Sequence, residues 1–146
     1  MVERVTSLQV AKLAGVSQSA VSRVFTPGAS ASSKTMLKVR AAAIELGYRP
    51  NILARSLITG KSRIIGLVVA YLDNYFYPVA LEKLSNALQT LGYHVLVFMA
   101  SNDTESTDHV IDGLLDYQVD GIIAASVSIS SDLTARCEAA GVPVVL

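Results

Sequence analysis

Hydrophobic residues in the first fifty positions recur at helical spacing, and each amphipathic stretch begins after a hydroxyl-bearing residue. The first stretch opens with Thr6-Ser7-Leu8-Gln9, the capping-box pattern in which the first and last side chains each satisfy a free backbone N–H of the other. Gly15 ends it, since glycine readily takes the left-handed conformation of a helix C-cap. Ser32-Ser33 can cap a later helix that stops at Gly47, and we expect the inward face of this helix to carry Leu37, Ala41 and Ile44.

A middle helix follows the first after a short turn, Ala14-Gly15-Val16-Ser17, with Ser17 as its cap. Two helices joined in this way are typical of a helix-turn-helix, in which the second helix enters the major groove of DNA. One side of the middle helix is apolar and the other is polar, with Gln18, Ser19, Ser22 and Arg23. Glutamine can pair with adenine and arginine with guanine, and serine is permissive. From the helices alone, the alternative is an ordinary three-helix bundle with a solvated polar face.

Charge divides the chain into two parts. Residues 1–63 hold ten Lys or Arg and two acidic residues, a net charge of +8, whereas residues 64–146 hold two basic and ten acidic residues, a net charge of −8. This asymmetry predicts two bodies with different partners. A compact segment at +8 is typical of a polyanion binder, although charge alone would also suit a membrane surface or an acidic protein. Together with the helix-turn-helix pattern, the charge favours double-stranded DNA.

From residue 64 onward, apolar runs alternate with helical periodicity. We expect strands over 64–70, 93–100, 121–125 and 142–146, and helices over 78–91, 106–117 and 132–140. Such apolar strands alternating with helices are typical of a parallel sheet covered on both faces. Gly92 and Gly141 are expected to end helices just before strands. The predicted fold class of the whole chain is an all-α helix-turn-helix headpiece followed by an α/β parallel-sheet lobe.

Ligands of open α/β sheets bind beyond the carboxyl ends of the strands. At these positions the chain has a carboxylate, hydroxyls and aromatic rings, a mixture that favours a small polar ligand such as a sugar or nucleoside. Polar residues fill most such loops whether or not a ligand binds, so each position is a hypothesis. The residues are Tyr71, Asp73, Tyr75 and Phe76 after the first strand, Ser101 and Asn102 after the second, and Ser126 and Ser128 after the third.

The sequence offers little for catalysis. It has no recognisable triad, glycine-rich phosphate loop or metal-ligand spacing, so we expect neither an enzyme nor a cofactor or metal. Cys137 has no cysteine partner and is interpreted as a small apolar residue late in a helix. No apolar run is long enough to span a bilayer, and the first residues lack the apolar segment of a secretory signal. We therefore expect a cytoplasmic protein with no membrane partner.

Three motifs, in order, resemble the DNA-binding headpiece of the lac repressor (LacI) family. They are Val10-Ala11-Lys12-Leu13-Ala14-Gly15-Val16-Ser17, Ala20-Val21-Ser22-Arg23-Val24 and Glu45-Leu46-Gly47-Tyr48-Arg49-Pro50-Asn51. The resemblance implies a helix-turn-helix domain over 1–49, a hinge helix and linker over 50–62, and the first part of a periplasmic-binding-protein-like core over 63–146. Gln9 stands where the family usually has an acid, which affects only the local cap.

The resemblance also implies which residues contact DNA, with Gln18, Ser19 and Arg23 at base edges. The full set is Thr6, Ser17, Gln18, Ser19, Ser22, Arg23, Asn51, Ala54 and Leu57. In the resembling family the hinge folds on the operator, where paired helices enter the minor groove and a leucine wedges into a base step. Leu57 matches that wedge, with Ala54 one turn earlier on the same face. The alternative is that Leu57 anchors the linker in the following lobe. In the lobe, Phe76 matches a position that lines the effector pocket.

We therefore expect a sequence-specific transcriptional regulator, a repressor that binds operator DNA as a homodimer and is controlled by a small polar metabolite. One competing class is a solute-binding or enzymatic α/β domain with a helical appendage, and another is a DNA-binding protein without effector response. The chain stops at Leu146 within a predicted strand, before the second lobe of the resembling family. We expect an incomplete lobe, either a fragment or a truncated product, and a truncated product would bind effector weakly and dimerise poorly.

Overall fold

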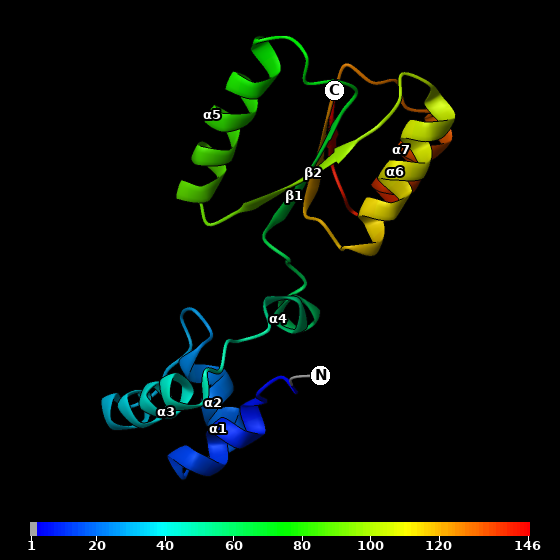
Figure 1. Cartoon of the computed structure of the whole chain (residues 1–146). Helices are drawn as coiled ribbons and strands as arrows, with labels where there is room; N and C mark the ends of the chain where they lie inside the picture. The colour runs from blue at the N-terminus through cyan, green and yellow to red at the C-terminus, as the bar shows by residue number, and fades with distance from the viewer. Residues whose placement is uncertain (1–2) are drawn as a thin grey trace. The chain divides into compact units, whose positions relative to one another are not determined.

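A computed structural model describes residues 3–146 of the chain. They divide into two compact units, of which the first ends at Asn51 and the second comprises Ile52–Leu146. The first contains helices α1 to α3, and the second contains α4 and all the strands (Figure 1). The division falls two residues after the headpiece boundary that the sequence predicts, so the predicted hinge helix clusters with the lobe.

The helices of the first unit begin and end where the cap residues predict. They are α1 (Ser7–Ala14), α2 (Gln18–Val24) and α3 (Ser33–Leu46). The capping box of α1 is complete, because the Thr6 N–H donates to Gln9 Oε1 over 2.8 Å and the Gln9 N–H donates to Thr6 Oγ1 over 3.4 Å. Gly15 and Gly47 end α1 and α3 with φ of 67° and 69°, the left-handed conformation that glycine adopts at low cost.

The core of the first unit consists of small and medium-sized residues. Val10, Val21 and Val39 are fully buried, and Ala42 and Ala43 lie beside them on α3. The inward face expected for the third helix is therefore wrong: Leu37 is 72% exposed, Ile44 is 82% exposed and Ala41 is exposed as well. α3 packs on α1 through its valine and alanines, and a close-packed contact between two helices leaves no space for larger side chains.

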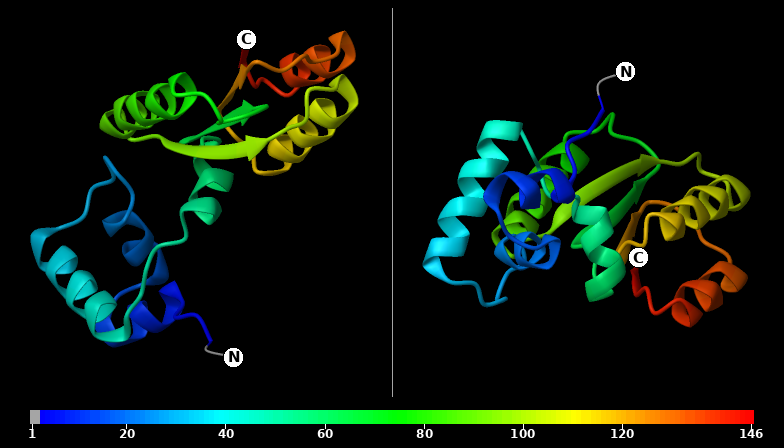
Figure 2. Two further views of the ribbon diagram at one scale, coloured as in Figure 1. Left: turned by 45° about the horizontal axis from the view of Figure 1, so that its top comes forward. Right: turned by 90° about the horizontal axis from the view of Figure 1, so that it is seen from below.

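The second unit begins with α4 (Ile52–Thr59) and continues as an open α/β sheet. The strands are all parallel, in the order β2-β1-β3-β4. α5 covers one face of the sheet, and α6 with α7 covers the other (Figure 2). The predicted class, a parallel sheet with helices on both faces, is confirmed. In chain order the elements are β1 (Ile64–Val69), α5 (Phe76–Thr90), β2 (His94–Met99), α6 (Thr104–Asp116), β3 (Gly121–Ala125), α7 (Ser131–Ala139) and β4 (Val144–Val145).

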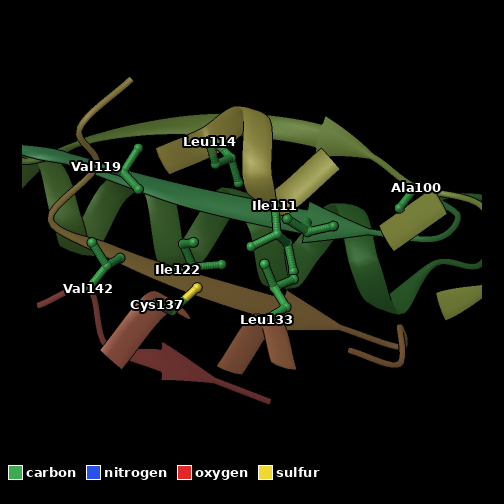
Figure 3. Packing of buried hydrophobic residues seen from close by; sticks show 9 residues of the cluster. Ala100, Ile111, Leu114, Val119, Ile122, Leu133, Cys137 and Val142 are labelled. Carbon is green, nitrogen blue, oxygen red and sulfur yellow. The ribbon is translucent and has the colours of Figure 1, made fainter. Parts of the chain in front are cut away.

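The apolar core of the second unit lies between the sheet and the helices α6 and α7. Ile111, Leu114, Ile122 and Leu133 are each at most 1% exposed, and Figure 3 shows them converging from helices and strand. Cys137 joins this cluster, as expected of a structural cysteine, and burial raises the pKa of its thiol. α5 buries none of its residues completely, so the opposite face of the sheet is covered less tightly.

Two helices of the lobe begin two residues earlier than the apolar pattern predicts, because polar side chains cap them. Asn74 Oδ1 accepts the N–H groups of Phe76 over 3.0 Å and Tyr77 over 3.3 Å, so α5 begins at Phe76 and not at position 78. Asp103 Oδ1 accepts the N–H of Ser106 over 2.7 Å, and α6 begins at 104 rather than 106. The glycines predicted to end helices, Gly92 and Gly141, have φ of 78° and 71°.

Candidate nucleic-acid interface and effector site

The helix α2 has one buried and one exposed face. Ala20, Val21 and Val24 are at most 9% exposed and belong to the side that contacts α1 and α3. A helix of roughly 10 Å diameter fits the major groove of B-DNA, which is about 12 Å wide. The exposed face therefore has the size, the donors and the acceptors needed to read base edges. The four polar residues predicted to approach DNA all lie on it: Gln18, Ser19, Ser22 and Arg23.

Hydrogen bonds fix the start of α2 against α1. Ser17 Oγ accepts the N–H of Ala20 over 3.2 Å, and Gln18 Nε2 donates to Ser7 Oγ over 2.8 Å. Ser17 therefore caps α2, and its hydroxyl still has a proton to donate to a phosphate oxygen. Thr6, also predicted to contact DNA, caps α1 in the same way. Val16 packs against the core at the turn between the two helices.

The positive charge of the first unit is not neutralised from within. Residues 3–51 hold seven basic side chains and two acidic ones, Glu3 and Glu45. No ion pair is found within this range. A small unit with a net charge of +5 attracts a polyanion. The basic residues are Arg4, Lys12, Arg23, Lys34, Lys38, Arg40 and Arg49.

The helix α4 carries the residues predicted to enter the minor groove. Leu57 is 74% exposed and Ile58 is 83% exposed, and Asn51 and Ala54 are exposed as well. The buried residue of α4 is Ser56, whose hydroxyl donates to the carbonyl of residue 53 over 2.6 Å. A leucine this exposed is not inserted in the lobe, which disfavours the alternative that Leu57 is a linker anchor.

At the carboxyl edge of the sheet, the loops after β1 and β3 are joined through Tyr77. The Tyr77 hydroxyl is hydrogen-bonded to Ser126 Oγ, and the Tyr77 ring lies edge-on to the Tyr71 ring, with the centroids 5.2 Å apart. The hydrogen bond with Ser126 lowers the pKa of Tyr77, and a hydrogen bond with Tyr71 lowers it further by a smaller amount. The structure thus brings together two residues predicted for the effector site, Tyr71 and Ser126.

The other residues predicted in the loop after β1 are open to solvent. Tyr75 is 88% exposed and Phe76 is 69% exposed, and the Phe76 ring centroid lies 5.3 Å from that of Tyr77. Asp73 is exposed too. These side chains are therefore accessible to a ligand, and the ring of Phe76 continues the aromatic surface that Tyr77 and Tyr71 begin.

The polar side chains of the loop after β2 mainly cap the N-terminus of α6. The Ser101 hydroxyl donates to the Asp103 carboxylate, and this bond, with the N–H of Ser106, lowers the pKa of Asp103. Asn102, between them, is exposed. The predicted Ser101 thus has a structural partner already, whereas Asn102 faces solvent.

Tyr77 and Asn74 are absent from the residues that the sequence predicts for the site. Asn74 carries a local signal, since an Asn that bonds backbone N–H groups two residues on is a common turn and helix-start motif. Tyr77 carries none, because its partner Ser126 lies 49 residues away along the chain. Only the alignment of β1 beside β3 brings the two together.

The described residues contain no group of three or more His, Cys, Asp or Glu side chains placed to hold a metal ion. No helix within residues 3–146 is both long and apolar enough to cross a membrane.

Comparison with protein families gives two matches, one for each unit. Residues 8–51 match the model of bacterial regulatory proteins of the lacI family. Residues 62–146, more than half of the chain, match the model of periplasmic binding proteins and the sugar binding domain of the LacI family. The chain belongs to the LacI family. The family predicted from the three headpiece motifs is thus confirmed.

Curated relatives of this LacI-family chain are regulators by name. The sucrose operon repressor of Streptococcus mutans is 39% identical over 132 residues, which are 90% of this chain and 41% of the relative. Catabolite control protein A of Staphylococcus aureus is 32% identical over 142 residues, 97% of this chain and 43% of the relative. The chain therefore spans about two fifths of the length of these relatives. Neither relative is named as an enzyme, in line with the expectation of a regulator.

Solved LacI-family structures share the fold. The lac repressor dimer bound to operator and the anti-inducer ONPF matches with a TM-score of 0.81 at 32% identity, over 97% of this chain and 44% of that one. A LacI-family transcriptional regulator from Silicibacter pomeroyi matches with a TM-score of 0.80 at 30% identity, over 96% of this chain and 42% of that one. The predicted combination of a helical headpiece and a parallel α/β lobe is confirmed.

Proposed function

We propose that this LacI-family protein is a sequence-specific DNA-binding regulator, acting as a repressor, in which α2 reads base edges in the major groove. The observation that carries the proposal is the exposed polar face of α2, where Gln18 and Arg23 stand on a helix whose other face is buried. These two side chains can pair with adenine and guanine. The unneutralised cations of the same unit would hold the phosphates. The relatives support this function, since the lac repressor was solved bound to operator.

The hinge contributes through α4. An eight-residue helix is marginal by itself in water, and Leu57 exposes most of its apolar surface. Insertion into the minor groove would cover that surface and bend the duplex. We assign Leu57 to the wedge, with Ala54 and Asn51 beside the same groove.

The lobe senses a small polar ligand, a sugar or a nucleoside, at the carboxyl edge of the sheet. Tyr71, Tyr77 and Ser126 form its centre, with Asp73 as the charged acceptor for hydroxyl groups. The remaining candidates at the rim are Tyr75, Phe76, Ser101 and Asn102. The name of one relative, a sucrose operon repressor, supports a sugar, and the lac repressor solved with an anti-inducer supports a bound ligand. The competing function, DNA binding without effector response, predicts no ligand at this edge.

A second copy of the chain is the partner proposed for the edge strand β2, on the face of the sheet that α5 covers loosely. Leu96 and Phe98 point to the core, whereas Val97 and Met99 on the other face are 40% and 50% exposed. Apolar side chains at a sheet edge that stay this exposed favour an interface. The solved lac repressor is a dimer, which supports self-association here.

The proposal is tested by comparing two variants that each replace one arginine with alanine and so lose the same charge. Wild-type protein first selects binding sites from a random DNA library, and affinities are then measured on the selected site and on random DNA. Arg23→Ala should lose about 1–3 kcal/mol of preference for the selected site. The control, Arg40→Ala, removes a cation from an exposed position of α3 and should weaken binding to both DNAs alike. An equal loss on both DNAs with Arg23→Ala would show that Arg23 touches only phosphate.

A further inference from the structure

The connector between α4 and β1 is held by a carboxylate from a distant part of the chain. Asp120 Oδ1 accepts the N–H of Ser62 over 2.9 Å and the hydroxyl of Ser62 over 3.2 Å. Asp120 Oδ2 accepts the N–H of Arg63 over 3.1 Å. Ser62 is 2% exposed, so its two hydrogen bonds to Asp120 are partly shielded from water, and a charged acceptor makes such bonds stronger.

The backbone of Arg63 adopts an unusual conformation that serves this contact. Its φ is 58°, a left-handed value that costs free energy in any residue with a Cβ. The conformation directs two successive N–H groups, those of Ser62 and Arg63, at one carboxylate, the arrangement known as an anion-binding nest. The guanidinium of Arg63 also lies 5.1 Å from the centre of the Tyr93 ring. The free-energy cost of this conformation is thus offset by the contacts that residues 62 and 63 make.

Both neighbouring strands take part in fixing the connector. The Asp120 N–H donates to the carbonyl of Ile64 over 2.8 Å, just before β3, and the His94 N–H, which begins β2, donates to the carbonyl of Arg63 over 2.8 Å. The Ile64 N–H donates to Ser62 Oγ over 3.2 Å. Residues 62–64 are therefore hydrogen-bonded to the starts of both β2 and β3. Both side-chain oxygens of Asp120 take part.

Residues 62–64, which these bonds hold, follow the hinge helix α4 closely in the chain. α4 ends at Thr59, and Gly60, with φ of 68°, and Lys61 alone separate it from Ser62. A groove of about 590 Å³ borders the junction, lined by Ser56 and Leu57 of α4 and by Asp120. Because an eight-residue helix has little stability of its own, the direction in which α4 leaves the lobe depends on how the connector is held.

We propose that Asp120 is a positioning residue of the hinge: its carboxylate locks residues 62–63 and thereby sets the direction of α4 relative to the sheet. The assignment of α4 to DNA rests on the proposed function, but the positioning itself does not. β3 (Gly121–Ala125) runs between Asp120 and Ser126, so one strand connects the carboxylate that holds the connector to a candidate effector residue at the carboxyl edge.

The first test measures the lock in the 146-residue chain without DNA. Asp120→Asn keeps the size and one acceptor but loses the second acceptor and the charge. Amide hydrogen exchange at Ser62 and Arg63 should then be faster by about tenfold to a hundredfold, the loss expected for a hydrogen bond to a charged group. Asp132→Asn is the matched control, because its carboxylate is 85% exposed, and it should leave these amides unchanged. Uniformly faster exchange throughout the sheet would mean that Asp120 merely supports the fold.

The second test measures the direction of α4. Nitroxide labels at Ile58→Cys and Glu138→Cys, both exposed positions, report the distance from α4 to α7, while the buried Cys137 stays unlabelled. The distance distribution should be narrow in the parent chain and in Asp132→Asn, and clearly broader in Asp120→Asn. An unchanged width with faster exchange at Ser62 and Arg63 would overturn the proposal.

Ser62→Ala provides a second variant that removes a smaller part of the lock. It loses the hydroxyl bonds to Asp120 and Ile64 but keeps both backbone bonds to the carboxylate. It should broaden the distribution less than Asp120→Asn does. Because neither readout involves DNA, failure of the positioning proposal and failure of the DNA-binding proposal give different results.

Discussion

Gly66 and Leu114 pack so closely that a Cβ added at Gly66 would lie 2.9 Å from Leu114 Cδ1. Gly66 is in the middle of β1, the second strand of the sheet, and Leu114 is fully buried on α6. Because Gly66 has no side chain, α6 can approach β1 closely at this position.

Gly66→Ala should destabilise the lobe by about 1–3 kcal/mol, since the side chain of Leu114, which is fully buried, would have to shift within the packed core. Thermal or urea unfolding followed by circular dichroism measures the effect. Gly113→Ala is the control. Gly113 lies beside Leu114 on α6, and nothing is within 4 Å of a Cβ added there. This variant should raise the free energy of unfolding by roughly 0.5–1 kcal/mol. Equal effects of the two variants would contradict the close packing.

Binding to DNA should fall steeply with salt, because the cations of the first unit are free to contact phosphates. The slope of log K against log salt should be close to −0.9 for each phosphate neutralised. Fluorescence anisotropy on random duplex DNA at several salt concentrations gives this slope. Removal of one contacting cation, tested with Lys38→Ala and Arg49→Ala, should reduce its magnitude by about one. A flat plot would exclude the electrostatic role of the first unit.

Leu57→Ala should reduce DNA bending and specific affinity while random-DNA affinity stays nearly the same. Alanine preserves the helix propensity of α4 but removes the wedge. Ile58→Ala is a matched control, because Ile58 is similarly exposed but lies about 100° further round the helix. A gel bending assay and titrations on selected and random DNA compare the two. If Ile58→Ala has the same effect as Leu57→Ala, α4 makes only general apolar contact with DNA and Leu57 is not a specific wedge.

Asp73→Ala and Tyr77→Phe should weaken ligand binding at the carboxyl edge. Loss of a charged acceptor is expected to cost about 1.5–3 kcal/mol, and loss of a neutral hydroxyl about 0.5–1.5 kcal/mol. Calorimetric titrations with sucrose, ribose and adenosine, on a protein that includes both lobes, measure this. Asp132→Ala, which removes an 85% exposed side chain from α7, is the control. Unchanged affinity in both test variants would remove these residues from the site.

Glutamate at the exposed face of β2 should weaken self-association. Val97→Glu with Met99→Glu places two like charges opposite their copies across the proposed interface. Sedimentation velocity over a range of concentrations gives the dissociation constant. Val145→Glu changes an exposed apolar residue on the other edge strand and should have no effect. A concentration-independent monomer in the parent chain would contradict the interface.

Local chemistry made the helix limits predictable. Thr6, Ser17 and Ser32 accept the N–H groups that the cap motifs require, and these bonds need only residues three apart. The face of α3 was less accessible to prediction, because hydrophobicity ranks Leu37 and Ile44 above Ala42 and Ala43. The distance between packed helices selects the small residues instead, and that distance is a tertiary property.

The candidate sites divide in the same way. The exposed face of α2 follows from helical periodicity, so its residues could be found in the sequence. The Tyr77–Ser126 and Ser62–Asp120 contacts join positions 49 and 58 residues apart. They exist because parallel strands bring distant loops to one edge of a sheet, and no periodicity within either loop encodes the partner.

The neutral caps of the first unit have a consequence for its behaviour in acid. α1, α2 and α3 begin at hydroxyl groups and have no acidic residue in their first turns, so no carboxylate neutralises the positive ends of their dipoles. In the lobe, α6 is capped by Asp103, whose pKa is lowered by its bonds to Ser101 and Ser106. That contribution is present above the ordinary pKa of Asp, about 3.9, and is lost as pH falls through the lowered value. Protonation thus weakens a helix cap of the lobe, whereas the hydroxyl caps of the first unit do not titrate in this range and remain intact.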